Sequence, residues 1–214
     1  MRLDPGGLVL HADISALTAH LCNDMVVDAQ GSAWVGNFGF DLDADLKARG
    51  LEVLTDHPVA NLVRIDADGT VHLAARDMHF PNGSVITPDG RTLIVGESFG
   101  PCLTAFDVAE DGSLSGRREW ARMERAVPDG ICLDAEDGIW VASPVSGAVL
   151  RLVEGGEVTD RVEVEHQAFA CMLGGPERRT LFICTAADSD PAKTDARSGR
   201  IESVEVEVPG AGLP

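Results

Sequence analysis

One pattern returns along this chain and restricts the folds that it can adopt. A polar residue is followed by about four apolar residues, an acidic turn and a second apolar run. The clearest copy begins at Asn82 and passes through Pro88-Asp89-Gly90 to Val95. Pro88 presets its own φ, Asp89 can bond its own backbone, and Gly90 accepts a positive φ. The pattern therefore predicts two short strands joined by a tight turn.

Further copies begin at Asn23 and Asp129, and a fainter one begins at about Ala170, so that the four start positions are 59, 47 and 41 residues apart. Repeats of about 40 to 50 residues with four strands each are typical of propeller blades. We therefore predict an all-β fold, a β-propeller of the six-bladed type with about four blades present. A second strand pair separates successive copies: Leu62–Ile65 with Val71–Ala74, Leu103–Val108 with Arg117–Trp120, and Val149–Val153 with Val158–Val164.

Residues 1–214 supply four blades and part of another at about 45 residues per blade. The leading run Leu8–His11 resembles a fragment of an outer strand pair, so we expect a single propeller domain that is incomplete at its N-terminus. The longest departure from the repeat, Gly39–Pro58, is expected among the loops of the first blade, with a helical turn or two at Ala44–Arg49. The polar segment Asp188–Gly199 is expected to form a loop between the last two strands.

The composition narrows the classes of partner. There are 17 Lys and Arg against 35 Asp and Glu, which gives a net charge of −18. Nucleic acid and anionic membrane are poor partners for a surface of this sign. The five cysteines form no CxxC pair and mostly lie in apolar runs, so we expect buried thiols rather than disulfides or a zinc site. The sequence shows no signal-peptide pattern, and we expect a cytoplasmic protein.

The start positions of the repeats carry the candidate chemistry. The innermost strands of a propeller run along its central channel, so residues that begin these strands converge near the axis. Asn23, Asn82 and Asp129 occupy this place in three copies, whereas the fourth copy has Ala170. Oxygen donors without thiol or imidazole are the ligands that hard divalent cations prefer. The alternative is that Asn and Asp before a strand simply form turns.

Three segments of the chain resemble the regucalcin/gluconolactonase (senescence marker protein) family: Cys22-Asn23-Asp24-Met25, Phe80-Pro81-Asn82-Gly83 and Val127-Pro128-Asp129-Gly130. The resemblance covers most of the chain, and it implies a six-bladed propeller that hydrolyses lactones with a divalent metal on its axis. The implied metal is Ca²⁺, with Zn²⁺, Mg²⁺ and Mn²⁺ as alternatives. The resemblance also implies that Asn82 and Asp129 are metal ligands and that Asn23 binds substrate and reaches the metal. Asp129 would also be the candidate general base, with water activated by the cation as the alternative route to attack on the lactone carbonyl.

Two departures from the family pattern affect these expectations. The family takes a further metal ligand from a Glu-Gly-Pro segment that this sequence lacks, in agreement with an absent N-terminal part. Leu21 stands where members that act on sugar lactones often have Arg, which favours a more apolar lactone or ester as substrate. The alternatives are a calcium-binding or protein-interaction propeller without enzymatic activity, and an inactive fragment of a lactonase. Phe38, Phe40 and Phe99 would either wall a substrate pocket or pack in the core.

Overall fold

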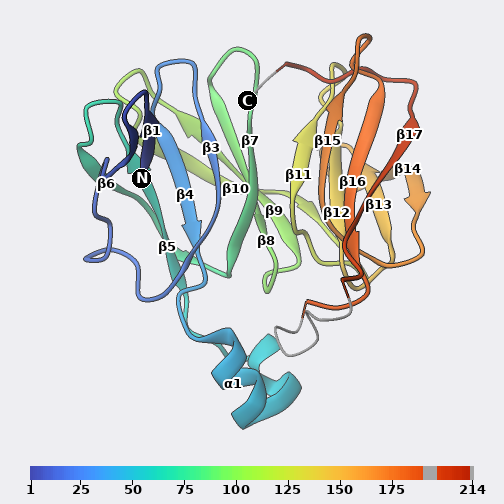
Figure 1. Cartoon of the computed structure of the whole chain (residues 1–214), viewed down its shortest axis with the longest axis horizontal. Coiled ribbons are helices and arrows are strands. Elements are labelled where there is room, and N and C mark those ends of the chain that lie inside the picture. The colour runs from blue at the N-terminus through green and yellow to red at the C-terminus, as the bar shows by residue number, and fades with distance from the viewer. Residues whose placement is uncertain (190–196, 213–214) are drawn as a thin grey trace.

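A computed structural model describes residues 1–189 and 197–212 of the chain. Four antiparallel sheets follow one another along the chain as four blades of a β-propeller, as predicted (Figure 1). Their innermost strands, β3, β7, β11 and β15, contact one another in that order. Blade I comprises β3 (Cys22–Val27), β4 (Ala33–Asn37), β5 (Ala60–Ile65) and β6 (Val71–Met78), and blade II comprises β7 (Pro81–Ile86), β8 (Thr92–Glu97), β9 (Cys102–Val108) and β10 (Leu114–Arg122).

The later blades differ in one respect from the predicted repeat. Blade III has four strands, but blade IV has three among the described residues, so the expected four strands per repeat hold only for the first three blades. The predicted loop Asp188–Gly199 lies largely outside the described residues. Blade III comprises β11 (Ile131–Leu133), β12 (Ile139–Ser143), β13 (Ala148–Leu152) and β14 (Val158–Glu163), and blade IV comprises β15 (Gln167–Gly174), β16 (Thr180–Ala186) and β17 (Arg200–Glu205).

The first residues of the chain form a separate hairpin. Strands β1 (Arg2–Asp4) and β2 (Gly7–Val9) pair only with each other in a two-stranded sheet. The connection between β4 and β5 contains the helix α1 (Leu42–Arg49) and the 3₁₀ helix η1 (Gly50–Leu54). Helix α1 begins two residues before the predicted start because the Asp41 carboxylate accepts a hydrogen bond from the Ala44 N–H at 3.0 Å and caps the first turn. Neither helix is long and apolar enough to cross a membrane, and no other helix of the described residues is.

The core lies between successive blades, where alternate residues of the strands interlock. Trp34 and Trp140 occupy matching places in blades I and III, and each is 1% exposed. Trp34 packs with Leu62, Leu93 and Phe106 between blades I and II. Burial of these large side chains is the main favourable term that holds neighbouring blades together, at about 2 kcal/mol or more for each large apolar side chain. The blades thus form a rigid frame for the ends of the inner strands.

The two ends of the inner strands have different structures. One end, the turn rim, carries the tight turns: Gly90 has a φ of 70°, and the Asp89 carboxylate accepts the Arg91 N–H at 3.0 Å, as predicted from the sequence. The other end, the start rim, is where β3, β7, β11 and β15 begin. The connection that contains α1 and η1 lies at this second end, at the bottom of Figure 1. The start rim therefore combines the start positions of the repeats with the longest described connection.

Candidate functional site

The structure brings Asn82 and Asp129 to neighbouring positions on the start rim. The Gly83 N–H, one residue after Asn82, donates to the Asp129 carbonyl at 3.2 Å. A Cβ atom on Gly83 would lie 2.5 Å from that oxygen, and one on Gly130 would lie 2.8 Å from the Cα of Ala170. These two glycines therefore allow the inner strands of blades II, III and IV to approach closely. Neither glycine has a positive φ, and Asn82 and Gly83 lie within β7, so the absence of a Cβ here serves close approach of the strands.

The side chain of Asn82 offers a free oxygen. Asn82 is 5% exposed, its Nδ2 donates to the Ser98 hydroxyl at 3.1 Å, and its Oδ1 has no hydrogen-bond partner among the described residues. A buried amide oxygen without a partner is costly, by about 1 to 3 kcal/mol. Such an atom at the start of an inner strand indicates that something outside the protein satisfies it.

The Asp129 carboxyl group has an unusual protonation equilibrium. Burial is the largest cause that raises its pKa, to about 7, and the nearby Asp24 carboxylate raises it further. Hydrogen bonds from the Asn82 amide and the Gly130 N–H lower the pKa, but they do not offset the two opposing effects. Among the residues that the structure describes, no Lys or Arg contributes to this balance. A cation bound beside Asp129 would supply the missing positive charge.

Asp24 is a member of the site that the sequence reasoning did not select. Burial raises its pKa as well, although part of the side chain remains exposed on the channel side. The signal was present, because Asp24 follows Asn23 directly at a start position. Strict alternation along a strand would place the two side chains on opposite faces. However, the β3–β4 ladder shifts register between Cys22 and Met25, and this irregularity removes the alternation on which a choice from sequence depends.

Asn23 lies where the repeat placed it, beside the start of the next blade. It is half-buried, and its Nδ2 lies 3.5 Å from the carbonyl oxygen of Pro81, the residue before Asn82. The contact is long, which leaves the amide available for other partners. The structure therefore collects all three predicted residues at one rim. At the fourth start position Ala170 packs under Gly130 and offers no ligand, as the sequence predicted.

The donor set suits a hard divalent cation. Within the described residues there is no cluster of three or more His, Cys, Asp or Glu side chains that could hold a metal ion. The start rim instead offers the two carboxylates of Asp24 and Asp129 and the free amide oxygen of Asn82. Asn37 at the end of β4 has a second buried amide oxygen without a partner. Calcium accepts such mixtures of carboxylate and amide oxygen, whereas zinc prefers imidazole and thiolate.

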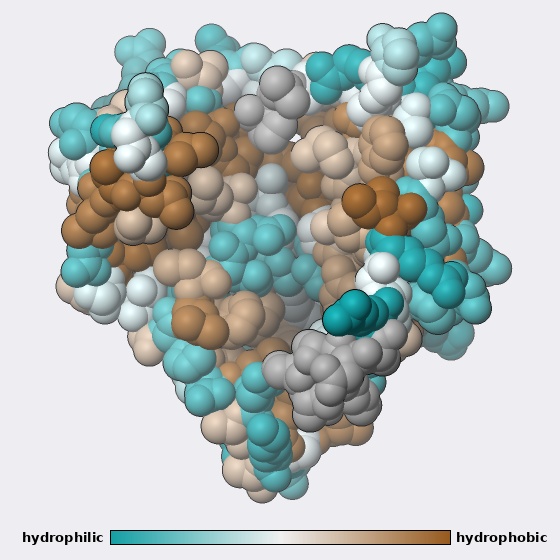
Figure 2. Space-filling model, in the orientation of Figure 1, coloured by the Kyte–Doolittle hydropathy of each residue, from teal (hydrophilic) through white to brown (hydrophobic). Residues whose placement is uncertain are grey.

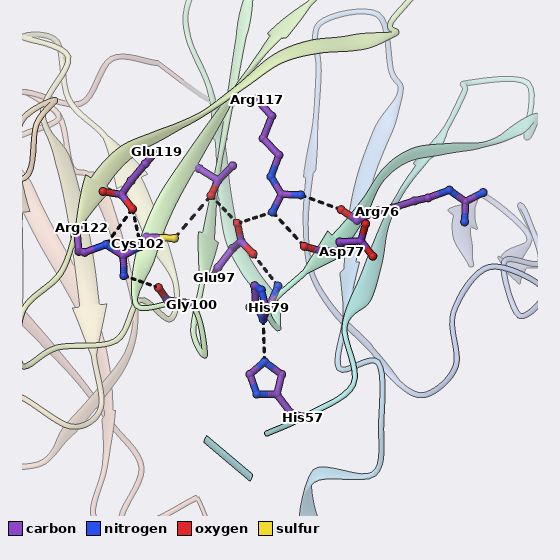
Figure 3. A network of polar contacts seen from close by, with 11 residues as sticks. His57, Arg76, Asp77, His79, Glu97, Gly100, Cys102, Arg117, Glu119 and Arg122 are labelled. Carbon is purple, nitrogen blue, oxygen red and sulfur yellow. Dashed lines mark hydrogen bonds and ion pairs between the residues drawn. The ribbon is translucent and has the colours of Figure 1, made fainter. Parts of the chain in front are cut away.

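A buried glutamate fixes the segment that leads to Asn82. Glu97 is 1% exposed, and its carboxylate accepts the His79 N–H at 2.6 Å and the Thr104 hydroxyl at 2.5 Å (Figure 3). Arg117 completes this network with an ion pair to Glu97 at 3.3 Å. The neighbouring Phe80 has a φ of 59°, an unusual value for a bulky residue. The Glu97 network therefore holds a strained segment immediately before the site.

The same network holds the helical connection of blade I in place. The Nε2 of His57, just after η1, lies 3.0 Å from the Nδ1 of His79, and the His57 Nδ1 lies 3.1 Å from the Val53 carbonyl oxygen (Figure 3). A carbonyl oxygen can only accept, so His57 carries its proton on Nδ1 and accepts at Nε2 from His79. Burial, followed by the charge of His79, lowers the pKa of His57 and favours this neutral form. His79 thus lies beside the start rim and is held by Glu97 and His57.

Aromatic side chains border the site on the side of blades I and II. The ring centroids of Phe38 and Phe80 are 4.7 Å apart, and those of Phe80 and Phe99 are 4.8 Å apart. Phe40 and Phe80 are buried with Val53 of η1, whereas Phe38 and Phe99 are only half-buried. Phe40 is therefore a core residue. Phe99 also lines a groove of about 890 Å³ together with Ser98, Leu54, Val127 and Val145.

A second hollow follows the inner strands away from the start rim. It has a volume of about 640 Å³ and is lined by residues of β3, β7, β11 and β15, with Asp24 among them. The face of the molecule in Figure 2 is hollowed at its centre, where Figure 1 places β7 and β11, and apolar side chains border the hollow. The polar residues of the start rim thus lie beside largely apolar space.

Comparisons with known proteins identify the family and the fold of the chain. The family model described as the SMP-30/Gluconolactonase/LRE-like region matches residues 4–187. The 6-deoxy-6-sulfogluconolactonase of Pseudomonas putida is 29% identical over 199 residues, which are 90% of this chain and 64% of that relative. The chain therefore spans less than two thirds of the length of this relative.

Two solved structures share the fold. The calcium-binding protein regucalcin of Agrobacterium tumefaciens is 25% identical with a TM-score of 0.76, across 98% of this chain and 70% of that protein. The gluconolactonase XC5397 of Xanthomonas campestris is 26% identical with a TM-score of 0.61, across 77% of this chain and 54% of that protein.

Proposed function

The chain belongs to the SMP-30/gluconolactonase/LRE-like family, and from this premise we propose that it is a lactone hydrolase that depends on a divalent cation. Similar proteins are named as lactonases, among them the sulfogluconolactonase and the gluconolactonase described above. A similar structure is named as a calcium-binding protein, which supports Ca²⁺ as the cation. The substrate would be a small molecule that enters the start rim.

One observation carries the proposal: the start rim holds negative charge and a buried oxygen, and no cationic partner for them lies among residues 1–189 and 197–212. The Asn82 Oδ1 is unpaired, and the pKa of Asp129 is raised to about 7 by burial and by Asp24. Asn82 and Asp129 would hold the cation, and Asp24 and Asn23 lie beside them. A bound cation stabilises the negative charge that develops on the carbonyl oxygen during ring opening.

Three residues of the chain have the remaining roles in the proposed reaction. Asp129 accepts the proton of the water molecule that attacks the lactone carbonyl, which a carboxylate near the reacting atoms can do. Asn23 donates a hydrogen bond to the substrate with the amide that its long contact to Pro81 leaves available. The half-buried ring of Phe99 contacts the substrate from the groove that it lines. Ring opening then gives a hydroxy acid.

The apolar side of the rim favours a particular substrate class. The Phe38 N–H donates to the Leu21 carbonyl at 3.0 Å, so these two apolar residues lie together at the edge of the site. Leu21 is 63% exposed and offers no charge or hydrogen bond to a hydroxylated substrate. We therefore expect aliphatic or aryl lactones to be hydrolysed with a higher kcat/KM than sugar lactones.

The test is a hydrolysis screen on the chelator-treated protein with cations restored one at a time. Lactones of both classes serve as substrates, and release of the acid is measured. Asp129→Ala should lower kcat/KM by a factor of about 10³ or more, since it removes a ligand and the base. Asp89→Ala on the turn rim is the matched control and should retain activity. Unchanged turnover in the Asp129 variant would exclude the mechanism.

The second candidate is a calcium-binding propeller without hydrolytic activity. The similarity to a protein named as calcium-binding favours it. The same screen separates the two functions, because this candidate binds Ca²⁺ in calorimetry but hydrolyses none of the lactones at any cation concentration. Loss of binding in Asp129→Ala would then assign the cation site without the reaction.

A further inference from the structure

The amide group of Asn82 has an oxygen end and a nitrogen end, and only the oxygen can bind a cation. Because the group is planar and nearly symmetric, a rotation of its side chain by half a turn would present the wrong atom. The following inference rests on the proposed function and concerns what fixes this choice. The relevant residue is Ser98, which follows β8 directly and is 7% exposed.

A count of protons determines the orientation. The Ser98 Oγ lies 2.6 Å from the carbonyl oxygen of Pro128, and a carbonyl oxygen can only accept. The single hydroxyl proton of Ser98 is therefore donated to Pro128. The Asn82 side chain lies 3.1 Å from the same Oγ, which has only lone pairs left to offer. Asn82 must accordingly direct its Nδ2 toward Ser98, and its Oδ1 faces the other way, unpaired.

Ser98 also links the two sides of the site. Its backbone N–H donates to the Phe80 carbonyl at 3.1 Å, on the segment that leads to Asn82. Its hydroxyl reaches Pro128, the residue before Asp129, across the boundary between blades II and III. One buried side chain thus contacts the segments that carry both proposed ligands.

We propose that Ser98 is a positioning residue that orients the Asn82 amide so that its oxygen faces the cation. The Ser98 hydroxyl donates its single hydrogen bond to the Pro128 carbonyl. Its oxygen can therefore only accept a hydrogen bond from the Asn82 amide. The Asp129 carboxylate also accepts from this amide, so Ser98 and Asp129 favour the same orientation in the cation-free protein. A cation bound to the Asp129 carboxylate would remove that second contact, and without the Ser98 hydroxyl both orientations of the amide then become accessible.

The first measurement is Ca²⁺ affinity by calorimetry on the full chain. Ser98→Ala should weaken binding by a factor of about 10 to 100, the range typical when a partner that orients a ligand is removed. Thr185→Val is the matched control, because Thr185 is also buried at the end of a second strand, in blade IV, and donates to Glu202. It should lose stability to a similar degree but retain the Ca²⁺ affinity.

A double-mutant cycle separates orientation from general damage. In Asn82→Asp both ends of the ligand are oxygens, so no orientation has to be chosen. Ser98→Ala should therefore weaken Ca²⁺ binding strongly in the native background and by less than about threefold in the Asn82→Asp background. Thermal unfolding of all four proteins without cation shows that each is folded.

The outcomes are distinct. A strong coupling between the two substitutions supports the assignment of Ser98. Equal losses in both backgrounds, or unchanged affinity in Ser98→Ala, overturn it while leaving the proposed cation site intact. Absence of Ca²⁺ binding by the native chain overturns the inference together with the cation dependence on which it rests.

Discussion

One aspartate precedes strand β11 in the sequence and another follows it, and the environments of their two carboxylates are opposite. Asp134 follows the strand on the turn rim and is 0% exposed. Its carboxylate lies 2.6 Å from the Arg151 Nε, and it also accepts the backbone N–H groups of Glu136 and Gly138 at 3.0 and 2.9 Å. Asp129 precedes the strand on the start rim, and no cationic side chain in the described part of the chain affects its carboxyl group.

Asp134 and the proposed ligand Asp129 thus have different roles, although they lie within six residues of each other. The charge of Asp134 is satisfied by its own chain, so it strengthens the fold. The charge of Asp129 has two hydrogen bonds but no cationic partner among the described residues, and burial and Asp24 outweigh those bonds, so the charge costs stability until a cation binds. A protein retains such an arrangement where it does chemistry, because a preorganised site is often a strained one. The comparison therefore predicts which substitutions damage the fold and which damage the site.

The largest effect is expected from Asp134→Ala. Removal of this carboxylate leaves the guanidinium of Arg151 buried without its partner, which destabilises the protein by about 4 kcal/mol. Urea unfolding followed by fluorescence measures the change, and Asp134→Asn should be milder because its oxygen still accepts the turn N–H groups. A loss below about 1 kcal/mol for the alanine variant would show that the turn rim does not depend on this pair.

Gly83→Ala should follow, because it forces apart the strands that carry Asn82 and Asp129. The added Cβ would lie 2.5 Å from the Asp129 carbonyl oxygen and 2.6 Å from the Ile131 nitrogen, both backbone atoms with little freedom to move. We expect a loss of about 3 kcal/mol in unfolding free energy, the size typical of overpacking in a rigid region. Gly6→Ala, with no atom within 4 Å of its Cβ, is the control and should be neutral. Retention of full stability in Gly83→Ala would indicate that the strand starts are pliable.

The blades and the turn rim could be predicted from the sequence, but not every residue of the candidate site. The Pro88-Asp89-Gly90 turn is a local feature and the strand repeat is a periodic one, and the structure confirmed both. Asn82 and Asp129 were predicted to converge because the repeat places them at equivalent positions, and they do meet. Local chemistry and periodicity can be read from a sequence, since each depends on few residues.

The parts that could not be predicted depend on contacts between distant segments. Asp24 was missed because a register shift in β3 breaks the alternation that would assign its face. The role of Gly83 as a point of close approach depends on where the Asp129 carbonyl lies, 46 residues later in the sequence. The hydrogen bonds of Ser98 join three segments, and its role can be inferred only when the direction of each bond is known. None of these features leaves a periodic signal.

The pH dependence of the cation-free protein should sharpen the comparison. The folded pKa of Asp129, about 7, lies above the unfolded value of 3.8. A raised pKa means that its contribution is fully favourable below about pH 4 and is lost as the pH rises through about 7. Stability in the presence of a chelator should therefore fall between pH 5 and pH 8, by about 2 kcal/mol from this group.

The control for this slope is Asp129→Asn, which should abolish most of the fall. Carboxylates with lowered pKa values, such as Asp89 and Asp111 on the turn rim, lose their contribution only as the pH falls toward their own lower values, below this window. His57 acts in the opposite direction, because its pKa is lowered, so the difference between the native and variant slopes is the quantity to compare. Identical slopes would mean that Asp129 is not the group responsible. Saturating Ca²⁺ should flatten the native slope.

The smallest effect, and the one that tests the site most finely, is expected from Asp24→Asn. The Asp24 charge is the second cause of the raised pKa of Asp129, after burial, so its removal should shift the fall in stability to lower pH. It also removes negative charge near the proposed cation, which should weaken Ca²⁺ binding about 10-fold, or about 1.4 kcal/mol.

The matched control for Asp24 lies on the same strand. Asp28 follows β3 on the turn rim, as Asp134 follows β11, and its carboxylate accepts the N–H groups of Gln30 and Ser32 at 2.9 Å each. Asp28→Asn should therefore leave Ca²⁺ affinity unchanged, although it lies only four residues from Asp24. If both variants weaken binding equally, the cation responds to the overall negative charge of the protein rather than to a site. If only Asp24→Asn does so, the start rim of blade I contributes to the same site as blades II and III.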